Sequence, residues 1–282
     1  MRATRALHKR ILLTFDFDLT LAPATIDTLL EVLGIEREAW QRERVDPLIG
    51  DGWDQILAHG FALIEAARAV GRPLDSAVIR ETAARIKPFP GVPEMFDRLR
   101  AVAGEIADDI ALEFTILSAG FVDIIIDTEL AKKFDNIWAS QFHFNDDGVV
   151  TFVKRTITHP EKVLYLEALG KGLGPAGPNA PDSAVPVEGS ERHAPIDQMI
   201  YVGDGASDLQ AFRFIEENGG YAIAIAKDDG TFAAQKKMQP DQRVENVAPP
   251  DFSGGSELLR SLTLAVKSAA ARIELRRLGQ EK

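Results

Sequence analysis

The sequence predicts an α/β fold: a Rossmann-like parallel sheet with helices on both faces and an inserted helical cap. Short apolar runs bounded by turn residues recur along the chain, and helical periodicity follows most of them, as expected for parallel strands joined by helices. One long segment between the first two runs is helical in pattern and has no clear strand, which predicts the insertion. The expected strands cover residues 11–15, 113–117, 137–140, 198–202 and 221–225.

The inserted segment covers residues 22–87. Helical patterns occur at 26–33, 53–70 and 77–86, and the segment ends at the rigid sequence KPFPG, residues 87–91. We therefore expect a cap over 22–87 and a core built from 1–21 and 88–282. Proline-containing stretches at both ends of the segment are the expected hinges.

Turn residues and hydrophobic periodicity predict the structure of the rest of the chain. The turn NDDG at 145–148, with apolar or aromatic flanks, predicts a β-hairpin over 142–152. Residues 171–195 are rich in Gly, Pro, Ala and Ser, and we expect a mobile surface loop without assigned chemistry. The pattern at 256–278 predicts a long amphipathic helix packed on the core.

Composition narrows the class of partner. The chain has 282 residues, 45% of them hydrophobic, and a net charge of -11, which argues against nucleic acid or an anionic membrane as the main partner. The absence of cysteine excludes disulfides and thiolate zinc sites and suits a reducing interior. No run approaches 18 apolar residues, and the apolar run at 11–15 is too short for a signal peptide. We expect a cytoplasmic protein; the sequence gives no oligomeric state.

A pair of carboxylates follows the first predicted strand. Asp16 and Asp18 lie two residues apart, which in extended backbone places both side chains on one face. One carboxylate can attack phosphorus while the other handles the proton of the leaving group, so that one hard displacement becomes two easier ones. Because a carboxylate pair packed against an apolar strand is costly without a cation, the pair indicates a metal-assisted phosphoryl-transfer site.

A second acidic motif, GDGASD at 203–208, follows another predicted strand. Its glycines allow a tight turn, and Asp204 and Asp208 are four residues apart, on one face if a helix begins there. Since Mg²⁺ prefers carboxylates, waters and phosphate oxygens, Asp16 and Asp204 are its predicted ligands. Asp208 is expected to support them through hydrogen bonds to waters or to Lys162.

Two further segments suit a phosphate group. Ser118, Ala119 and Gly120 come between a predicted strand and a helical pattern starting at 121, and a hydroxyl with free amides at a helix N-terminus binds phosphate. Lys162 falls in the first turn of a helix predicted over 159–169, where positive charge is unfavourable, so a local anionic partner is expected. Lys154, in the hairpin region, is the competing candidate.

These four motifs, in this order, resemble the haloacid dehalogenase-like (HAD) superfamily of phosphohydrolases. The match runs from residue 11 to about residue 210 and reads DFDLT, LSAG, Lys162 and GDGASD. The resemblance implies an aspartyl-phosphate on Asp16, with Asp18 as acid/base and its backbone carbonyl on Mg²⁺. It assigns phosphate binding to Ser118, Ala119, Gly120 and Lys162, metal binding to Asp16, Asp18 and Asp204, and supporting roles to Thr20 and Asp208.

The layout is similar to that of phosphoserine phosphatases, with one departure. Those enzymes place a glutamate shortly after the first motif to read the substrate amine, whereas here the sequence is LAPATI at 21–26 and the first acid is Asp27. The sequence therefore predicts a Mg²⁺-dependent phosphatase acting on a small phosphorylated metabolite and leaves the substrate open. The alternatives are a hydrolytic dehalogenase, a phospho-accepting signalling protein and a non-catalytic binding protein.

Overall fold

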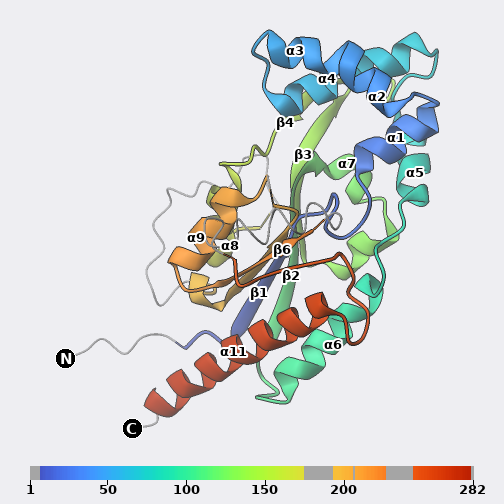
Figure 1. The fold of residues 1–282 in the computed structure, drawn as a ribbon. Helices are drawn as coiled ribbons and strands as arrows, with labels where there is room; N and C mark the ends of the chain where they lie inside the picture. Colours follow the sequence, from blue (N-terminus) through green and yellow to red (C-terminus); the bar gives the residue numbers. More distant parts are fainter. Residues whose placement is uncertain (1–6, 175–192, 206, 227–243, 281–282) are drawn as a thin grey trace.

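The computed structural model describes residues 7–174, 193–205, 207–226 and 244–280, and Figure 1 shows their arrangement. Within these residues the strands form a seven-stranded sheet of order β4-β3-β2-β1-β5-β6-β7, in which only β4 runs antiparallel to its neighbour. The strands are β1 (Arg10–Phe15), β2 (Ala111–Phe121), β3 (Asn136–Phe144), β4 (Val150–Arg155), β5 (Met199–Gly203), β6 (Tyr221–Ile225) and β7 (Asn246–Ala248).

Both faces of the sheet are buried at its centre, which explains why β1, β5 and β6 read as nearly continuous apolar runs. In β1, Leu13 and Phe15 point into one core, under α6 (Val92–Gly104) and α11 (Glu257–Gln280). Leu12 points into the other core, where α8 (Lys162–Gly170) and α9 (Leu209–Glu217) pack. The predicted α/β fold with helices on both faces is confirmed.

A group of helices separates β1 from α6, and we call residues 22–87 the insert. Asp54 and Asp75 start two of its helices by accepting hydrogen bonds from amides of the first turn, and Gly34, at φ 70°, ends another. Figure 1 shows α2, α3 and α4 standing beyond the tips of β3 and β4. The helices of the insert are α1 (Thr25–Leu33), α2 (Arg37–Trp40), the π-helical turn η1 (Gln41–Val45), α3 (Asp46–Gly50), α4 (Gln55–Ala69) and α5 (Ser76–Arg85).

The two ends of the insert lie side by side. The backbone amide of Phe89 donates to the carbonyl of Leu21 at 2.8 Å, so the chain enters and leaves the insert at one point. Helix α4 also packs on β4. The division into a core of 1–21 and 88–282 and a cap of 22–87 stays a prediction.

The remaining elements complete the connections. The hairpin of β3 and β4 turns at Asn145–Gly148, as predicted, and α11 covers the predicted C-terminal helix. The predicted loop at 171–195 lies largely in 175–192, outside the described residues. No described helix is long and apolar enough to span a membrane. The short elements are α7 (Val122–Ile125) and the 3-10 turns η2 (Glu129–Lys133) and η3 (Ile196–Gln198).

One local expectation is wrong, and the condition attached to another is not met. Strand β2 continues through Ser118, Ala119 and Gly120 to Phe121, and only the four residues of α7 follow, so these residues do not form a helix N-terminus. Because α9 begins at Leu209, with Asp208 as its N-cap, Asp204 and Asp208 do not share a helical face either. In both places, strand pairing or a turn occupies residues where a helix start was considered.

Candidate active site

The first carboxylate, Asp16, follows β1 directly. Its amide donates to the carbonyl of Val202 on β5 at 2.8 Å, and its Oδ1 accepts from the amide of Phe17 at 2.7 Å. The Phe17 side chain is fully buried in the core. These contacts fix Asp16 at the carboxyl edge of the sheet, where ligands bind in open α/β folds.

A tight turn after Asp16 carries Asp18. Leu19 has φ 58°, a left-handed conformation rare for a side chain of this size, and its amide donates to the carbonyl of Ala22 at 2.8 Å. Asp18 accepts at Oδ1 from the amide of Thr25 at 2.7 Å and at Oδ2 from the Thr25 hydroxyl at 3.2 Å. The first turn of α1 therefore holds the Asp18 carboxylate.

Lys162 is the first residue of α8, and its side chain is fully buried. Its Nζ donates to Asp16 Oδ2 at 3.0 Å and to Asp208 Oδ1 at 2.5 Å, and Tyr201 donates to the same Asp208 oxygen at 2.6 Å. The anionic partner that we expected for Lys162 is thus the pair of buried carboxylates of Asp16 and Asp208. The competing candidate, Lys154, lies exposed on β4.

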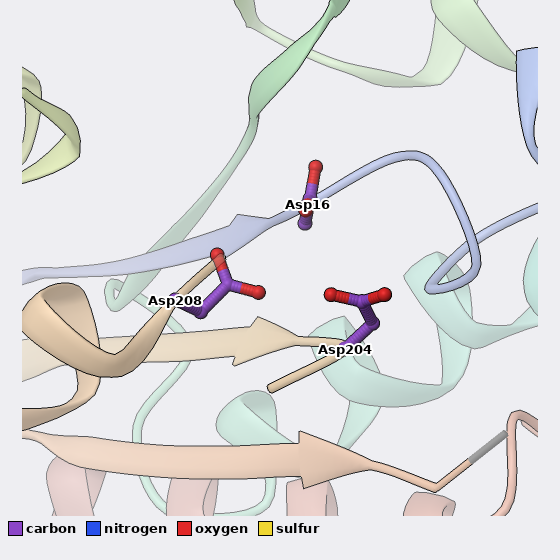
Figure 2. Close-up of side chains that lie close together, drawn as sticks. All are labelled: Asp16, Asp204 and Asp208. Carbon is purple, nitrogen blue, oxygen red and sulfur yellow. The ribbon is translucent and has the colours of Figure 1, made fainter. Parts of the chain in front are cut away.

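Asp204 completes the carboxylate group. Figure 2 shows Asp16, Asp204 and Asp208 close together, and one carboxylate oxygen from each lies within 4.8 Å of the others. Ser207 donates to Asp204 Oδ1 at 3.2 Å and to Asp208 Oδ2 at 3.3 Å. The two acidic motifs therefore meet, although Asp204 and Asp208 belong to a turn and an N-cap.

The serine segment at the end of β2 closes the site from the other side. Ser118 is 1% exposed, and its Oγ accepts from the amide of Gly120 at 3.1 Å. A Cβ atom on Gly120 would lie only 2.7 Å from Asp18 Oδ2 and 3.4 Å from Ser118 Oγ. The glycine is needed because backbone and carboxylate approach so closely.

Burial changes the proton affinities of these groups. It raises the pKa of Asp16 to about 6, against the opposing effect of Lys162. It also raises the pKa of Asp18 to about 7, although the hydrogen bond from the Thr25 amide works in the other direction. Burial lowers the pKa of Lys162, but Asp16 and Asp208 more than offset it, so that pKa lies above its usual value and the ammonium stays charged.

Thr20 stands apart from the other predicted site residues. Its side chain is fully buried, and its Oγ1 has no hydrogen-bond partner among the described residues. The contacts of Thr20 therefore do not account for the supporting role predicted from the motif.

Sequence reasoning missed two residues that contact the site. Tyr201 lies in an apolar strand, three residues before Asp204. A tyrosine hydroxyl buried in such a strand needs a hydrogen-bond partner, and this need was the available signal. Thr25 was taken as part of the segment before a predicted helix. Its seven-residue distance from Asp18 gives no periodic signal, because a turn joins the two.

The donor set fits a magnesium ion. The predicted ligands Asp16 and Asp204 offer carboxylate oxygens, which Mg²⁺ prefers, and Asp208, which is bound to Lys162, lies beside them. Lys162 contacts Asp16 and Asp208, and Asp204 lies beside them, so the mutual repulsion of these acids contributes to the raised pKa of Asp16. A divalent cation would relieve that repulsion.

No family model matches the chain. A curated relative, an uncharacterized protein from Borreliella burgdorferi (strain ATCC 35210 / DSM 4680 / CIP 102532 / B31), is 21% identical over 201 residues. The alignment covers 66% of this chain and 68% of that protein.

Solved structures are more informative about the fold. A HAD family hydrolase from Salmonella enterica subsp. enterica serovar Typhi matches with a TM-score of 0.59 at 18% identity, covering 92% of this chain and 72% of that one. A phospho-aspartyl intermediate analogue of phosphoserine phosphatase matches with a TM-score of 0.54 at 18% identity, covering 90% and 98%. The chain has a HAD-like fold with a phosphoserine phosphatase-type layout, as the sequence resemblance implied.

Proposed function

We propose that the chain is a Mg²⁺-dependent phosphatase that hydrolyses a small phosphomonoester through an aspartyl-phosphate on Asp16. The observation that carries the proposal is the contact of the buried Lys162 ammonium with Asp16 and Asp208, beside Asp204 and with Asp18 two residues away. A nucleophile, an acid, a cation and a set of metal ligands thus share one buried site. The HAD-like fold supports the same conclusion.

In the first step, an oxygen of Asp16 forms a bond to phosphorus while the ester P–O bond breaks. The departing oxygen takes a proton from Asp18. The pKa of Asp18 near 7 leaves a protonated fraction at neutral pH, as a general acid requires. The products of this step are the free alcohol and a phosphorylated Asp16.

In the second step, water attacks the same phosphorus and gives a proton to the Asp18 carboxylate. The bond between phosphorus and Asp16 breaks, which releases inorganic phosphate and regenerates the Asp16 carboxylate. Asp18 therefore begins and ends the cycle in the same protonation state, so two carboxylates suffice for both steps.

The remaining residues bind the phosphoryl group. Lys162, the hydroxyl of Ser118 and the amides of Ala119 and Gly120 would neutralise and orient its oxygens. Asp16, Asp204 and the backbone carbonyl of Asp18 would hold Mg²⁺, which supplies charge neutralisation when bound. Asp208 keeps Lys162 in place.

We assign residues 22–87 the role of a cap, and the hydrogen bond between Leu21 and Phe89, where the chain enters and leaves the insert, supports this role. The proposed substrate is a small phosphorylated metabolite in the cytoplasm. A dehalogenase needs neither Asp18 nor the acidic cluster, and a signalling receiver has no use for the insert. Both alternatives are therefore less well supported than a phosphatase.

The test is hydrolysis of p-nitrophenyl phosphate with Mg²⁺ and with EDTA. We expect turnover that EDTA abolishes and Mg²⁺ restores, and Asp16→Asn should reduce it by about 10⁴-fold or more. Acid-quenched wild-type enzyme should carry one phosphoryl group by mass spectrometry, and the Asp16→Asn variant should carry none. Full turnover in the metal-free protein, or a phosphorylated Asp16→Asn variant, would contradict the proposal.

A further inference from the structure

Tyr201 brings a hydroxyl into the buried carboxylate cluster. It lies on β5, its side chain is fully buried, and its ring meets that of Phe212 on α9 edge to face, with centroids 5.7 Å apart. The hydroxyl donates to Asp208 Oδ1 at 2.6 Å, and the same oxygen accepts from Lys162. Burial and the neighbouring Asp208 raise the pKa of Tyr201 well above its usual value, so the phenol remains a donor.

Asp208 occupies the N-cap of α9, but its side chain does not cap the helix. An aspartate at this position commonly accepts a hydrogen bond from an amide of the first helical turn, and the described first turn of α9 makes no such bond to Asp208. The carboxylate is bound to Lys162 and Tyr201 instead. The amides of α9 are thus a local alternative for this carboxylate, and contacts with distant residues determine its orientation.

The backbone at the end of β5 limits the same carboxylate from another side. A Cβ atom on Gly203 would lie 2.2 Å from Asp208 Oδ2, so only a glycine leaves room for the carboxylate in this position. Tyr201 and Gly203 are two residues apart on one strand. Together they fix Asp208, one through a hydrogen bond and the other through the space that it leaves.

The orientation of Asp208 determines how the ammonium of Lys162 is placed. An ammonium has three N–H donors, and Asp16 and Asp208 accept two of them. Because the three N–H bonds are arranged tetrahedrally, fixing two of them also fixes the direction of the third. If Asp208 turned toward the amides of α9, Lys162 would keep only its contact with Asp16, and the direction of its other N–H bonds would be lost.

We propose that Tyr201 is a positioning residue for phosphoryl transfer, which holds Asp208 so that the third N–H of Lys162 is directed to a phosphoryl oxygen. This inference rests on the proposed phosphatase function. Tyr201 acts through Asp208 and Lys162 and supplies no group to the reaction itself. Preorganised charge of this kind accelerates a reaction because the protein does not have to rearrange when the transition state forms.

The kinetic test uses Tyr201→Phe, which removes the hydroxyl and keeps the ring. With p-nitrophenyl phosphate and Mg²⁺, kcat/KM should fall by about ten- to a hundredfold, since a misplaced ammonium stabilises the transition state less well. The constant for competitive inhibition by inorganic phosphate should rise by about three- to tenfold, because the same ammonium binds the product. Both constants are measured well below the unfolding temperature, where a loss of stability alone leaves them unchanged.

A matched control is available on the neighbouring strand. Thr14 of β1 lies in register with Tyr201 on β5, and its side chain is also fully buried. Its hydroxyl has no hydrogen-bond partner within the part of the chain that the structure describes. Thr14→Val therefore removes a buried hydroxyl beside Tyr201 without breaking a hydrogen bond. It should leave kcat/KM and the inhibition constant of phosphate as in wild type.

A double-mutant cycle tests whether Tyr201 acts through Asp208. In Asp208→Ala the acceptor of the tyrosine hydroxyl is gone, so adding Tyr201→Phe to this variant should lower kcat/KM by less than about twofold. An additional loss as large as that caused by Tyr201→Phe alone would overturn the route through Asp208. If Asp208→Ala does not fold, the comparison of Tyr201→Phe with Thr14→Val still tests the proposal.

The outcomes separate this inference from the proposed function. A folded Tyr201→Phe variant with the kcat/KM and phosphate inhibition of wild type would show a purely structural tyrosine and leave the phosphatase standing. Equal losses in Tyr201→Phe and Thr14→Val would also overturn the positioning role. Absence of turnover by the wild-type protein with Mg²⁺ would overturn the phosphatase and this inference together.

Discussion

Thr25 donates two hydrogen bonds to the carboxylate of Asp18, one from its backbone amide at 2.7 Å and one from its hydroxyl at 3.2 Å. Thr25 is the first residue of α1, so the proposed general acid is bound by the first helix of the insert. Both hydrogen bonds stabilise the charged carboxylate and work against the burial that raises the pKa of Asp18. The position of α1 and the protonation of Asp18 are therefore linked.

Replacing the Thr25 hydroxyl tests this link. In Thr25→Val the backbone hydrogen bond remains and the side-chain bond is lost, so the pKa of Asp18 should rise and the limb of the pH–rate profile that belongs to Asp18 should move to higher pH. We expect kcat for an alkyl phosphate to change by less than about tenfold. Thr25→Ser, which keeps the hydroxyl, should restore the wild-type profile; a profile of Thr25→Val that superposes on wild type would contradict the role of the hydroxyl.

Lys162 should matter for folding as well as for activity. Lys162→Met leaves Asp16 and Asp208 buried without a cation, which should lower the free energy of unfolding by about 3–5 kcal/mol. Since protonation relieves the repulsion between the two carboxylates, the loss measured by urea unfolding should be smaller at pH 5.5 than at pH 8. Lys154→Met, at an exposed lysine, should stay within about 0.5 kcal/mol of wild type. Equal stability of the two variants would refute this account.

Gly120 limits where Asp18 can lie. In Gly120→Ala the new methyl group would sit 2.7 Å from Asp18 Oδ2, so the carboxylate must shift, and kcat for alkyl phosphates should fall by about 10²-fold. Gly104→Ala, at a helical position with no atom within 4 Å of the added Cβ, is the matched control and should retain full activity. If both variants had wild-type kcat, the close approach at Gly120 would not constrain the acid.

The sequence was sufficient to locate the carboxylates because parallel strands end at one edge of a sheet. Asp16 and Asp204 follow β1 and β5, which are neighbours in the sheet. Predicting these two strands therefore also predicts that the two carboxylates lie close together. The carboxylate partners of Lys162 were signalled by its unfavourable place at a helix N-terminus. In these cases local chemistry and topology indicate the same arrangement.

Prediction from the sequence failed where contacts between distant residues determine the local structure. The strand β2 runs on through Ser118 because pairing with β3 resumes at Phe121 after an irregularity, and no local propensity shows this. The hydrogen bond from Thr25 to Asp18 depends on the left-handed turn at Leu19, and a leucine in the sequence does not predict this conformation.

The proposed division of labour between the two carboxylates of the first motif makes a prediction about leaving groups. If Asp18 protonates the departing oxygen, Asp18→Asn should slow an alkyl phosphate far more than p-nitrophenyl phosphate, whose phenolate leaves without a proton. We expect a loss of about 10²- to 10⁴-fold in the first step for the alkyl ester and a much smaller loss for the aryl ester, measured as phosphorylation of Asp16 in single-turnover experiments.

Because Asp18 also accepts the proton of the attacking water, the variant should accumulate phosphorylated enzyme with p-nitrophenyl phosphate, visible as a burst of p-nitrophenol followed by slow release of phosphate. The Asn side chain can still accept the hydrogen bond from the Thr25 amide, so thermal unfolding should stay close to that of wild type and separate a chemical effect from a structural one. Equal losses for the two esters, with no burst, would show that Asp18 does not transfer the proton in either step.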